Sequence, residues 1–411
     1  MIKLLGHLSK SRTFVLHNLG LRYLSWFIFF LMIFVLMHIS HWSLIGNSRI
    51  FPVFGDLRAV LLSVECTQTS VDNSLWEDCN YIYGSTLIKI LLTMRLEAVD
   101  THWIGFIFVG IFSGILAYVF FSISSLNKLK KFVCICIVVS PPSILLLERG
   151  NFDVVMIFLI FLAAITNFGK LQGLSFVLVV SASLLKFYSL PLFAIYFGWK
   201  KDYLRFLLVG VTLCFTTYIV FQDLMNSRGR IPADLNGSFG NTAFSLYLSH
   251  IYPSLNFSFM SGSLLGLFQL FMTFTFLKVC VRAKVQFFPP STTPQFQRSA
   301  VGRVQVFFIL TFLVCYFAGM NYDYRIIFVL IAAVIEINRL NLNGNSGLPL
   351  TVVTIFSAWF STVSGVFQPI GDISLGILVV YFLFNLSSSI LKGRTCRKVL
   401  GLTKSTKSQS E

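Results

Sequence analysis

Long apolar runs alternate with short polar stretches along almost the whole chain, and this alternation is its main structural signal. About 20 consecutive apolar residues are enough to cross a bilayer as a helix. Uncharged runs approaching that length favour transmembrane helices over strands. The pattern therefore predicts an all-α, polytopic transmembrane helical bundle of about twelve segments. They are expected at residues 24–45, 103–124, 132–147, 152–168, 172–186, 187–199, 204–222, 262–280, 304–320, 324–338, 349–366 and 373–390.

The polar stretches between these segments predict how the domain is organised. Two of them are long and fall on the same side of the membrane, at about 46–102 and 222–256. One transmembrane domain is expected over residues 1–391. It is followed by a basic cytoplasmic tail at 392–411, which we expect to lie near anionic lipid.

Several predicted segments are shorter than a full span. Residues 172–199 are the main ambiguity, because Lys186 and Pro191 interrupt the apolar pattern there. This region is consistent with two separate segments or with one bent hairpin.

The composition supports a membrane protein. Of 411 residues, 56% are hydrophobic and only 12% are charged, and the mean hydropathy is +0.79. A soluble domain carries about 25% charged residues. We therefore expect an integral, multi-pass membrane protein.

The net charge of +16 is distributed unevenly over the two sides of the predicted bundle. One side holds 23 of the 32 Lys and Arg residues but only three of the 16 Asp and Glu residues. Cytoplasmic loops are enriched in Lys and Arg, so this side and both termini are predicted to be cytoplasmic. The asymmetry explains the positive charge without nucleic acid, which we do not expect as a partner. The acid-rich side is expected to face the periplasm or exterior of a bacterial cytoplasmic (inner) membrane.

Four polar clusters fall at the same ends of the predicted segments, on the acid-rich side. A charged side chain at membrane depth costs several kcal/mol unless it is paired or reaches water. Such clusters therefore predict a polar site at the outer membrane surface. Their members are Asp56 and Arg58, then Glu148, Arg149, Asn151 and Asp153, then Lys186 and Tyr188, and finally Asn321, Tyr322, Asp323, Tyr324 and Arg325.

The residue types favour transfer from a phosphate-linked lipid donor. Arg149, Lys186 and Arg325 are cations placed where a lipid phosphate would lie, and arginine can bind phosphate with two parallel hydrogen bonds. Asp56 can accept the proton of an acceptor hydroxyl. The tyrosines and remaining polar residues are candidates for contact with the substrate. Each cluster also has a structural explanation, in which the charges only pair with one another or reach the interface.

The cysteines and histidines predict no metal site, and no cofactor is expected. Cys66 and Cys79 both fall in the first long loop, where a disulfide is permitted but cannot be established from spacing. His250, in the second long loop, is the one histidine that is plausible as a site residue.

The ordered set of motifs resembles the polytopic glycosyltransferases of the GT-C class, specifically the family 87-like, DUF2029-type enzymes. The resemblance rests on an Asp shortly after the first span, on R-G-N followed by an Asp at a helix start, and on K-x-Y followed by Pro. A Tyr-Asp-Tyr-Arg turn is also similar to members of this group. The matching residues are Asp56, Arg149 to Asn151 with Asp153, Lys186 and Tyr188 with Pro191, and Tyr322 to Arg325.

This resemblance implies a sugar donor linked to polyprenyl phosphate, often a mannose donor, used on the outer face with inversion at the anomeric carbon. The acceptor would be an envelope glycan or glycolipid. Asp56 would be the general base, and Arg149, Lys186 and Arg325 would hold the donor phosphate. Asn151 and Asp153 would orient the ligand or the helix contacts.

The chain also departs from the family pattern. The lysine and proline of the K-x-Y motif stand further apart than usual, and the first loop reads WEDCNYIYG where a Tyr-Pro signal is expected. Because of this departure, Asp72, Glu77 and Asp78 stay as rival candidates for the base.

Two other functions compete with this one. A polymerase or ligase for surface polysaccharide repeat units would use a diphosphate-linked donor, and would rely on the second loop around Arg228 and Arg230. A lipid-linked sugar flippase or other transporter ranks third. Transporters place their charges near mid-membrane and often contain inverted repeats, whereas the charges here gather at one surface.

Overall fold

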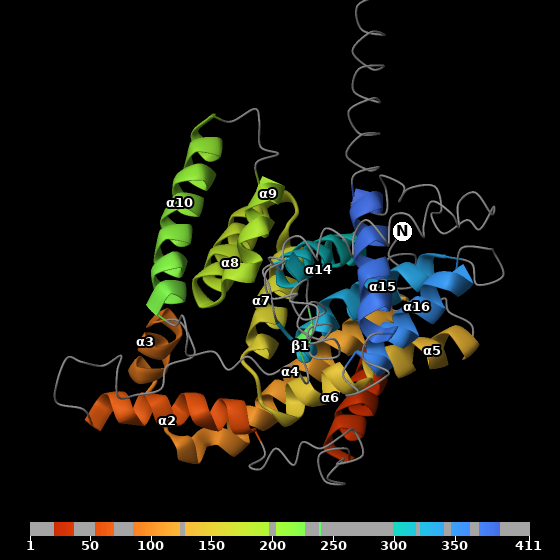
Figure 1. Ribbon diagram of the computed structural model, residues 1–411, viewed down its shortest axis with the longest axis horizontal. Coiled ribbons are helices and arrows are strands. Elements are labelled where there is room, and N and C mark those ends of the chain that lie inside the picture. The colour runs from red at the N-terminus through yellow and green to blue at the C-terminus, as the bar shows by residue number, and fades with distance from the viewer. Residues whose placement is uncertain are drawn as a thin grey trace, which may run out of the picture.

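The computed structural model describes residues 20–36, 54–69, 85–123, 128–196, 203–226, 238–239, 299–317, 321–340, 347–361 and 370–386. The described residues are almost entirely helical (Figure 1). The α-helices are α2 (Gly55–Thr69), α3 (Ser85–Thr93), α4 (Thr101–Ser122), α5 (Lys128–Val138), α6 (Pro141–Glu148), α7 (Asp153–Thr166), α8 (Gln172–Leu185), α9 (Phe193–Tyr196), α10 (Tyr203–Asn226), α14 (Ala300–Phe317), α15 (Ile327–Arg339) and α16 (Gly347–Phe360), with further helices at Gly20–Leu36 and Ile370–Leu386. The short elements are η1 (Ala98–Asp100), η2 (Gly169–Leu171), η3 (Phe187–Leu192), η5 (Asp323–Ile326), β1 (Ser238–Phe239) and β2 (Asn321–Tyr322).

Three helical stretches are long and apolar enough to cross a membrane: Ala98–Ser122, Tyr203–Asp223 and Ala300–Phe317. The pair α5 and α6 would make a fourth, bent by 45°. The bend follows from Pro141 and Pro142, which open α6 and cannot continue the hydrogen bonding of α5. Helices of this kind are those of an integral membrane protein. Shorter apolar helices occupy most of the other predicted segments, and residues 262–280 lie outside the described part, so twelve spans stay a prediction.

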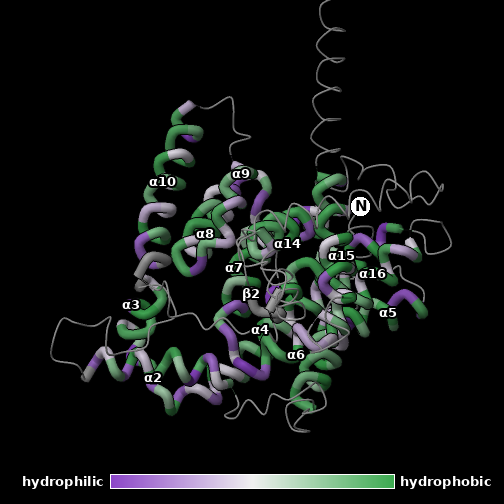
Figure 2. Tube along the Cα trace, in the orientation of Figure 1, coloured by the Kyte–Doolittle hydropathy of each residue, from purple (hydrophilic) through white to green (hydrophobic). Residues whose placement is uncertain are grey.

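The first predicted loop differs from expectation, because it contains α2, α3 and η1. The hydropathy pattern does not predict α2, because the helix is too short to span a membrane. Its buried residues are spaced one helical turn apart, at Leu57, Val60, Leu61 and Val64. Figure 2 shows hydrophilic and hydrophobic residues mixed along α2, which lies across the end of the bundle while α8 and α10 stand upright.

A disulfide is present in this region. Cys66, in α2, is disulfide-bonded. Cys79 lies outside the described residues, so the structure leaves the pairing of these two cysteines open, as the sequence does.

The ambiguous region 172–199 breaks at Lys186. This residue is extended (φ −151°, ψ 134°) between α8 and η3. The chain then turns back, so that η3 packs against α8 and α14. The bent hairpin is therefore the better description, and it presents Lys186 at its corner.

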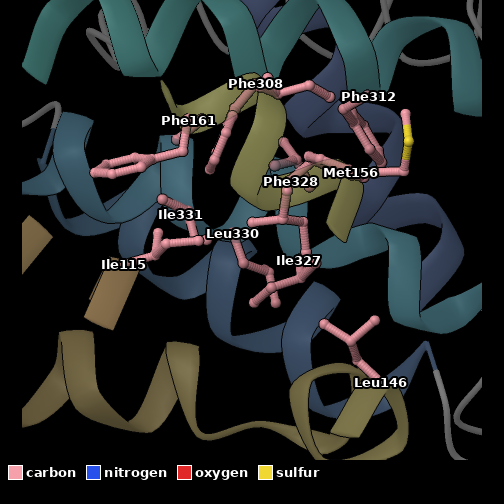
Figure 3. Close-up of a cluster of buried hydrophobic side chains, with 14 of the residues drawn as sticks. Ile115, Leu146, Met156, Phe161, Phe308, Phe312, Ile327, Phe328, Leu330 and Ile331 are labelled. Carbon is pink, nitrogen blue, oxygen red and sulfur yellow. The ribbon is translucent and has the colours of Figure 1, made fainter. Parts of the chain in front are cut away.

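The core is built around α15. Every residue of α15 from Ile327 to Ile337 is buried, because neighbouring helices surround it, among them α5, α14 and α16. Figure 3 shows this packing, in which Phe328 and Leu330 of α15 lie among side chains of α4, α6, α7 and α14. A helix that is enclosed in this way can hold both of its ends in fixed positions.

Candidate functional site

The turn between α6 and α7 forms the base of the site. Gly150 has a φ of +59°, a conformation that side chains disfavour. Its N–H bonds to the Leu147 carbonyl at 3.0 Å, and the Asn151 N–H bonds to the Leu146 carbonyl at 3.1 Å. This pattern closes α6 in the manner of a glycine C-cap and lets α7 begin only a few residues later.

The start of α2 docks on this turn. The Phe54 N–H donates to the Glu148 carbonyl at 2.8 Å. The Asp56 and Leu57 N–H groups both donate to the Arg149 carbonyl, at 3.0 and 3.3 Å. The first N–H groups of a helix have no partner within that helix, and here the carbonyls at the end of α6 supply one. The backbone thereby brings Asp56 to the R-G-N turn.

The Asp56 carboxylate is bound by both side chains of that turn. Arg149 Nε donates to Oδ1 at 2.9 Å, and Asn151 Nδ2 donates to Oδ2 at 2.7 Å. These residues are more than 90 positions apart in sequence. The ion pair is partly open, with side-chain exposures of 28% for Arg149 and 19% for Asp56.

Asp153, at the start of α7, is the centre of a second, deeper cluster. Its side chain is fully buried, and Lys186 Nζ donates to Oδ1 at 2.5 Å. Tyr188 also donates to Oδ1, and Arg325 Nε donates to Oδ2 at 3.0 Å. The Arg325 guanidinium lies 5.3 Å from the centre of the Tyr188 ring, within the range of a cation–π contact.

Asn151 joins the two clusters. Its Oδ1 accepts from the Asp153 N–H at 2.9 Å and from Lys186 Nζ at 3.4 Å, while its Nδ2 holds Asp56. A single amide therefore contacts the Asp56 carboxylate, the Asp153 backbone and the Lys186 ammonium group. The connected charged side chains are Asp56, Arg149, Asp153, Lys186 and Arg325.

The electrostatics of this connected set are unbalanced. Counted over the described side chains, it contains three cations and two carboxylates, so these five side chains carry one excess positive charge. The buried carboxylate is stabilised by two cations and a hydroxyl, which offsets the cost of removing it from water. Lys186 and Arg325 keep side-chain exposures of 12% and 15%. All three cations are thus tied to carboxylates on one side and reach the surface on another.

The other predicted site residues are distributed as follows. Arg58 is exposed on α2, and Glu148 is half-buried beside the turn. The backbone of Asn321 and Tyr322 forms β2, which pairs antiparallel with Ser238 and Phe239 of β1 in the second long loop. Asp323 and Tyr324 belong to η5, which packs on α6. The side chains at 321–324, together with Asp72, Glu77, Asp78, Arg228, Arg230 and His250, lie outside what the structure describes.

Sequence reasoning missed two features. The first is Phe54, a buried aromatic residue next to the site that has no polar signature. The second is a buried network around Glu336, one of the three acids on the side predicted to be cytoplasmic. Glu336 binds Arg339, three residues later, and this i, i+3 pairing was the available signal.

The described residues contain no group of three or more His, Cys, Asp and Glu side chains that could hold a metal ion. Comparison with protein-family models, with curated proteins and with solved structures finds no match to this chain. The geometry of the site is therefore the basis for proposing a function.

Proposed function

We propose that this protein is a membrane glycosyltransferase. It transfers a sugar, with mannose as one candidate, from a polyprenyl-phosphate donor to a glycan or glycolipid acceptor on the outer face. The observation that carries the proposal is the convergence of Asp56 with Arg149, Lys186 and Arg325 in one connected cluster, reached from four separate parts of the chain.

In this proposal the acceptor hydroxyl attacks the anomeric carbon from the face opposite the phosphate. A bond forms between the acceptor oxygen and that carbon, and the bond from the carbon to the phosphate oxygen breaks. Its electron pair leaves with the polyprenyl phosphate, and the hydroxyl proton passes to Asp56. The cations stabilise the negative charge that develops on the leaving phosphate. A single displacement of this kind inverts the anomeric centre.

The charge of the cluster supports a monophosphate donor. A sugar linked to polyprenyl phosphate is a phosphodiester with one negative charge, which matches the one excess positive charge of the five connected side chains. A diphosphate-linked donor brings at least two negative charges. Binding it would leave uncompensated negative charge in a partly buried site, which is costly.

The experiment that tests this proposal is transfer of label from a radiolabelled polyprenyl-phosphate sugar to acceptors in membranes containing the protein. Asp56→Asn keeps the side-chain shape and is expected to abolish transfer. Asp100→Asn is a matched control, since Asp100 lies outside the cluster and contacts Trp103. Full activity in Asp56→Asn would show that the base is another residue. No transfer by inserted wild-type protein with several such donors would refute the proposal.

A polymerase or ligase for polysaccharide repeat units is the second candidate. The observation in its favour is the pairing of β1 with β2, which attaches the second long loop to the turn that precedes Arg325. A long loop beside the site fits an enzyme that must hold two oligosaccharide chains. Transfer from a diphosphate-linked oligosaccharide, without transfer from monophosphate donors, would favour this alternative. A transporter is less consistent with carboxylates and cations gathered at helix ends.

A further inference from the structure

Phe54, the residue immediately before α2, adopts an unusual backbone conformation. Its φ is +57°, in the left-handed region that the Cβ atom of a non-glycine residue disfavours. Residues of this kind persist only where the surroundings hold them, and they gather at functional sites. Phe54 lies two positions before Asp56.

The Phe54 side chain is held between two glycines from different elements. It is completely buried. A Cβ atom at Gly105 of α4 would overlap its ring, and a Cβ atom at Gly150 would lie 2.9 Å from the Phe54 Cβ atom. The ring also meets Phe106 edge-on, with the ring centres 5.9 Å apart. The absence of side chains at both glycines thus makes the space that the aromatic ring occupies.

The Phe54 backbone is attached to the same turn that binds Asp56. Its N–H donates to the Glu148 carbonyl at 2.8 Å, and the next bonds along the chain lead from Asp56 and Leu57 to the Arg149 carbonyl. The left-handed φ directs the chain into α2 at this point. A displacement of Phe54 would therefore move Asp56 relative to Arg149 and Asn151.

We propose that Phe54 is a positioning residue for Asp56. Its ring, packed between Gly105 and Gly150, holds the start of α2 on the α6–α7 turn, so that the carboxylate meets Arg149 and Asn151. The positioning itself is a matter of structure, and only the catalytic consequence rests on the proposed function. Phe54 does not touch the reacting atoms in this scheme, and acts through the backbone of α2.

The test uses one substitution at two positions of α4. Gly105→Ala places a methyl group against the Phe54 ring, whereas Gly110→Ala meets nothing within 4 Å. Alanine is favoured over glycine inside a helix, so both variants are expected to fold. Hydrogen exchange is measured on the amides of Asp56 and Leu57 in the full-length protein. We expect loss of protection in Gly105→Ala and wild-type protection in Gly110→Ala.

The same variants are then assayed for glycosyl transfer. Gly105→Ala is expected to lower kcat about a hundredfold, as for a misplaced catalytic group, with little change in the KM for the donor. Gly110→Ala should behave as wild type. A purely structural role would lower the amount of folded protein without changing kcat per folded molecule.

A second pair replaces the ring itself. Phe54→Leu is compared with Phe112→Leu, because Phe112 is also fully buried but packs on Phe34, away from the turn. Only Phe54→Leu should lower the hydrogen-exchange protection of the Asp56 and Leu57 amides.

The outcomes separate the two proposals. Unchanged amide protection in both Gly105→Ala and Phe54→Leu would overturn the positioning role. Lost protection with unchanged kcat, in an enzyme shown to be active, would overturn its catalytic consequence. Lost protection in a protein whose wild type transfers no sugar would support the positioning of Asp56 and refute only the proposed function.

Discussion

Two polar networks meet the central helix α15, one at each end, and they differ in how many charged side chains each one connects. At the start of α15, Arg325 joins Asp153 in a set with more cations than acids. At its end, Glu336 accepts from Arg339, from Gln305 Nε2 at 2.9 Å and from Tyr381 OH at 2.9 Å.

Around Glu336 the network is closed, with a buried carboxylate at its centre. It pairs one carboxylate with one cation, and both carboxylate oxygens are occupied by side chains of α14, α15 and the helix Ile370–Leu386. Lys130 of α5 nearby donates to the Leu340 carbonyl at 2.6 Å. These contacts tie helices together. Counted over the described side chains, the network around Asp56 and Asp153 connects three cations to two carboxylates, and Arg149 is its most exposed cation. We propose the network at the start of α15 as the site and the network at its end as a structural contact, because the first connects two carboxylates to three cations and the second pairs one carboxylate with one cation.

Removal of the deepest carboxylate is expected to have the largest effect. Asp153→Asn leaves Lys186 and Arg325 without the charge that both contact. Loss of one partner from a buried ion pair costs about 3–5 kcal/mol. Thermal unfolding in detergent should show a large loss of stability, whereas Asp56→Asn, at the partly exposed pair, should unfold much closer to wild type. Equal melting temperatures for the two variants would contradict the distinction between the partly open Asp56 pair and the deeper Asp153 cluster.

A substitution in the closed network should lower the stability of the protein without changing its binding of the donor. Glu336→Gln removes the charge partner of Arg339 and weakens an acceptor of Tyr381. The expected loss is about 1–3 kcal/mol of unfolding free energy, since buried donors lose their acceptor. Donor binding per folded molecule should match wild type. A loss of donor binding as large as that of an Arg149 variant would mean that the two ends of α15 do not differ as described.

Substitution of Arg149 should have the reverse effect, with a small change in stability and a large change in donor kinetics. Its pair with Asp56 is partly exposed, so Arg149→Ala is expected to change the unfolding free energy by less than about 1 kcal/mol. Loss of a charged hydrogen bond to phosphate should lower kcat/KM for the donor about ten- to a hundredfold. Arg149→Lys keeps the charge but not the forked geometry, and should recover only part of the activity. Kinetics that do not depend on the residue at 149 would remove it from the phosphate site.

The smallest effects should come from two tyrosine hydroxyls. Tyr188 donates to Asp153 and Tyr381 donates to Glu336, and both tyrosines are buried. Each Tyr→Phe change removes one hydrogen bond and is expected to cost about 1 kcal/mol of stability. Only Tyr188→Phe should also alter donor KM. If Tyr381→Phe changes KM to the same extent, the contrast between the two networks is wrong.

Much of this architecture follows from the sequence by itself. Apolar runs predict helices because a helix satisfies its own backbone hydrogen bonds in lipid, and the described helices match most of the predicted segments. The clusters around Arg149, Lys186 and Arg325 were recognisable because charged residues interrupt those runs at helix ends. Their shared location was predictable for the same reason.

Tertiary structure alone decided which of these groups meet. The sequence offered Asp56 as one of several loop acids, and only the docking of α2 on the α6–α7 turn pairs it with Arg149 and Asn151. The same holds for Phe54, whose role depends on glycines that lie about 50 and 100 residues away in the chain. It also holds for Glu336, which the charge pattern places on the predicted cytoplasmic side and the packing encloses. Hydropathy encodes where helices begin and end, whereas contacts between distant side chains depend on how those helices pack.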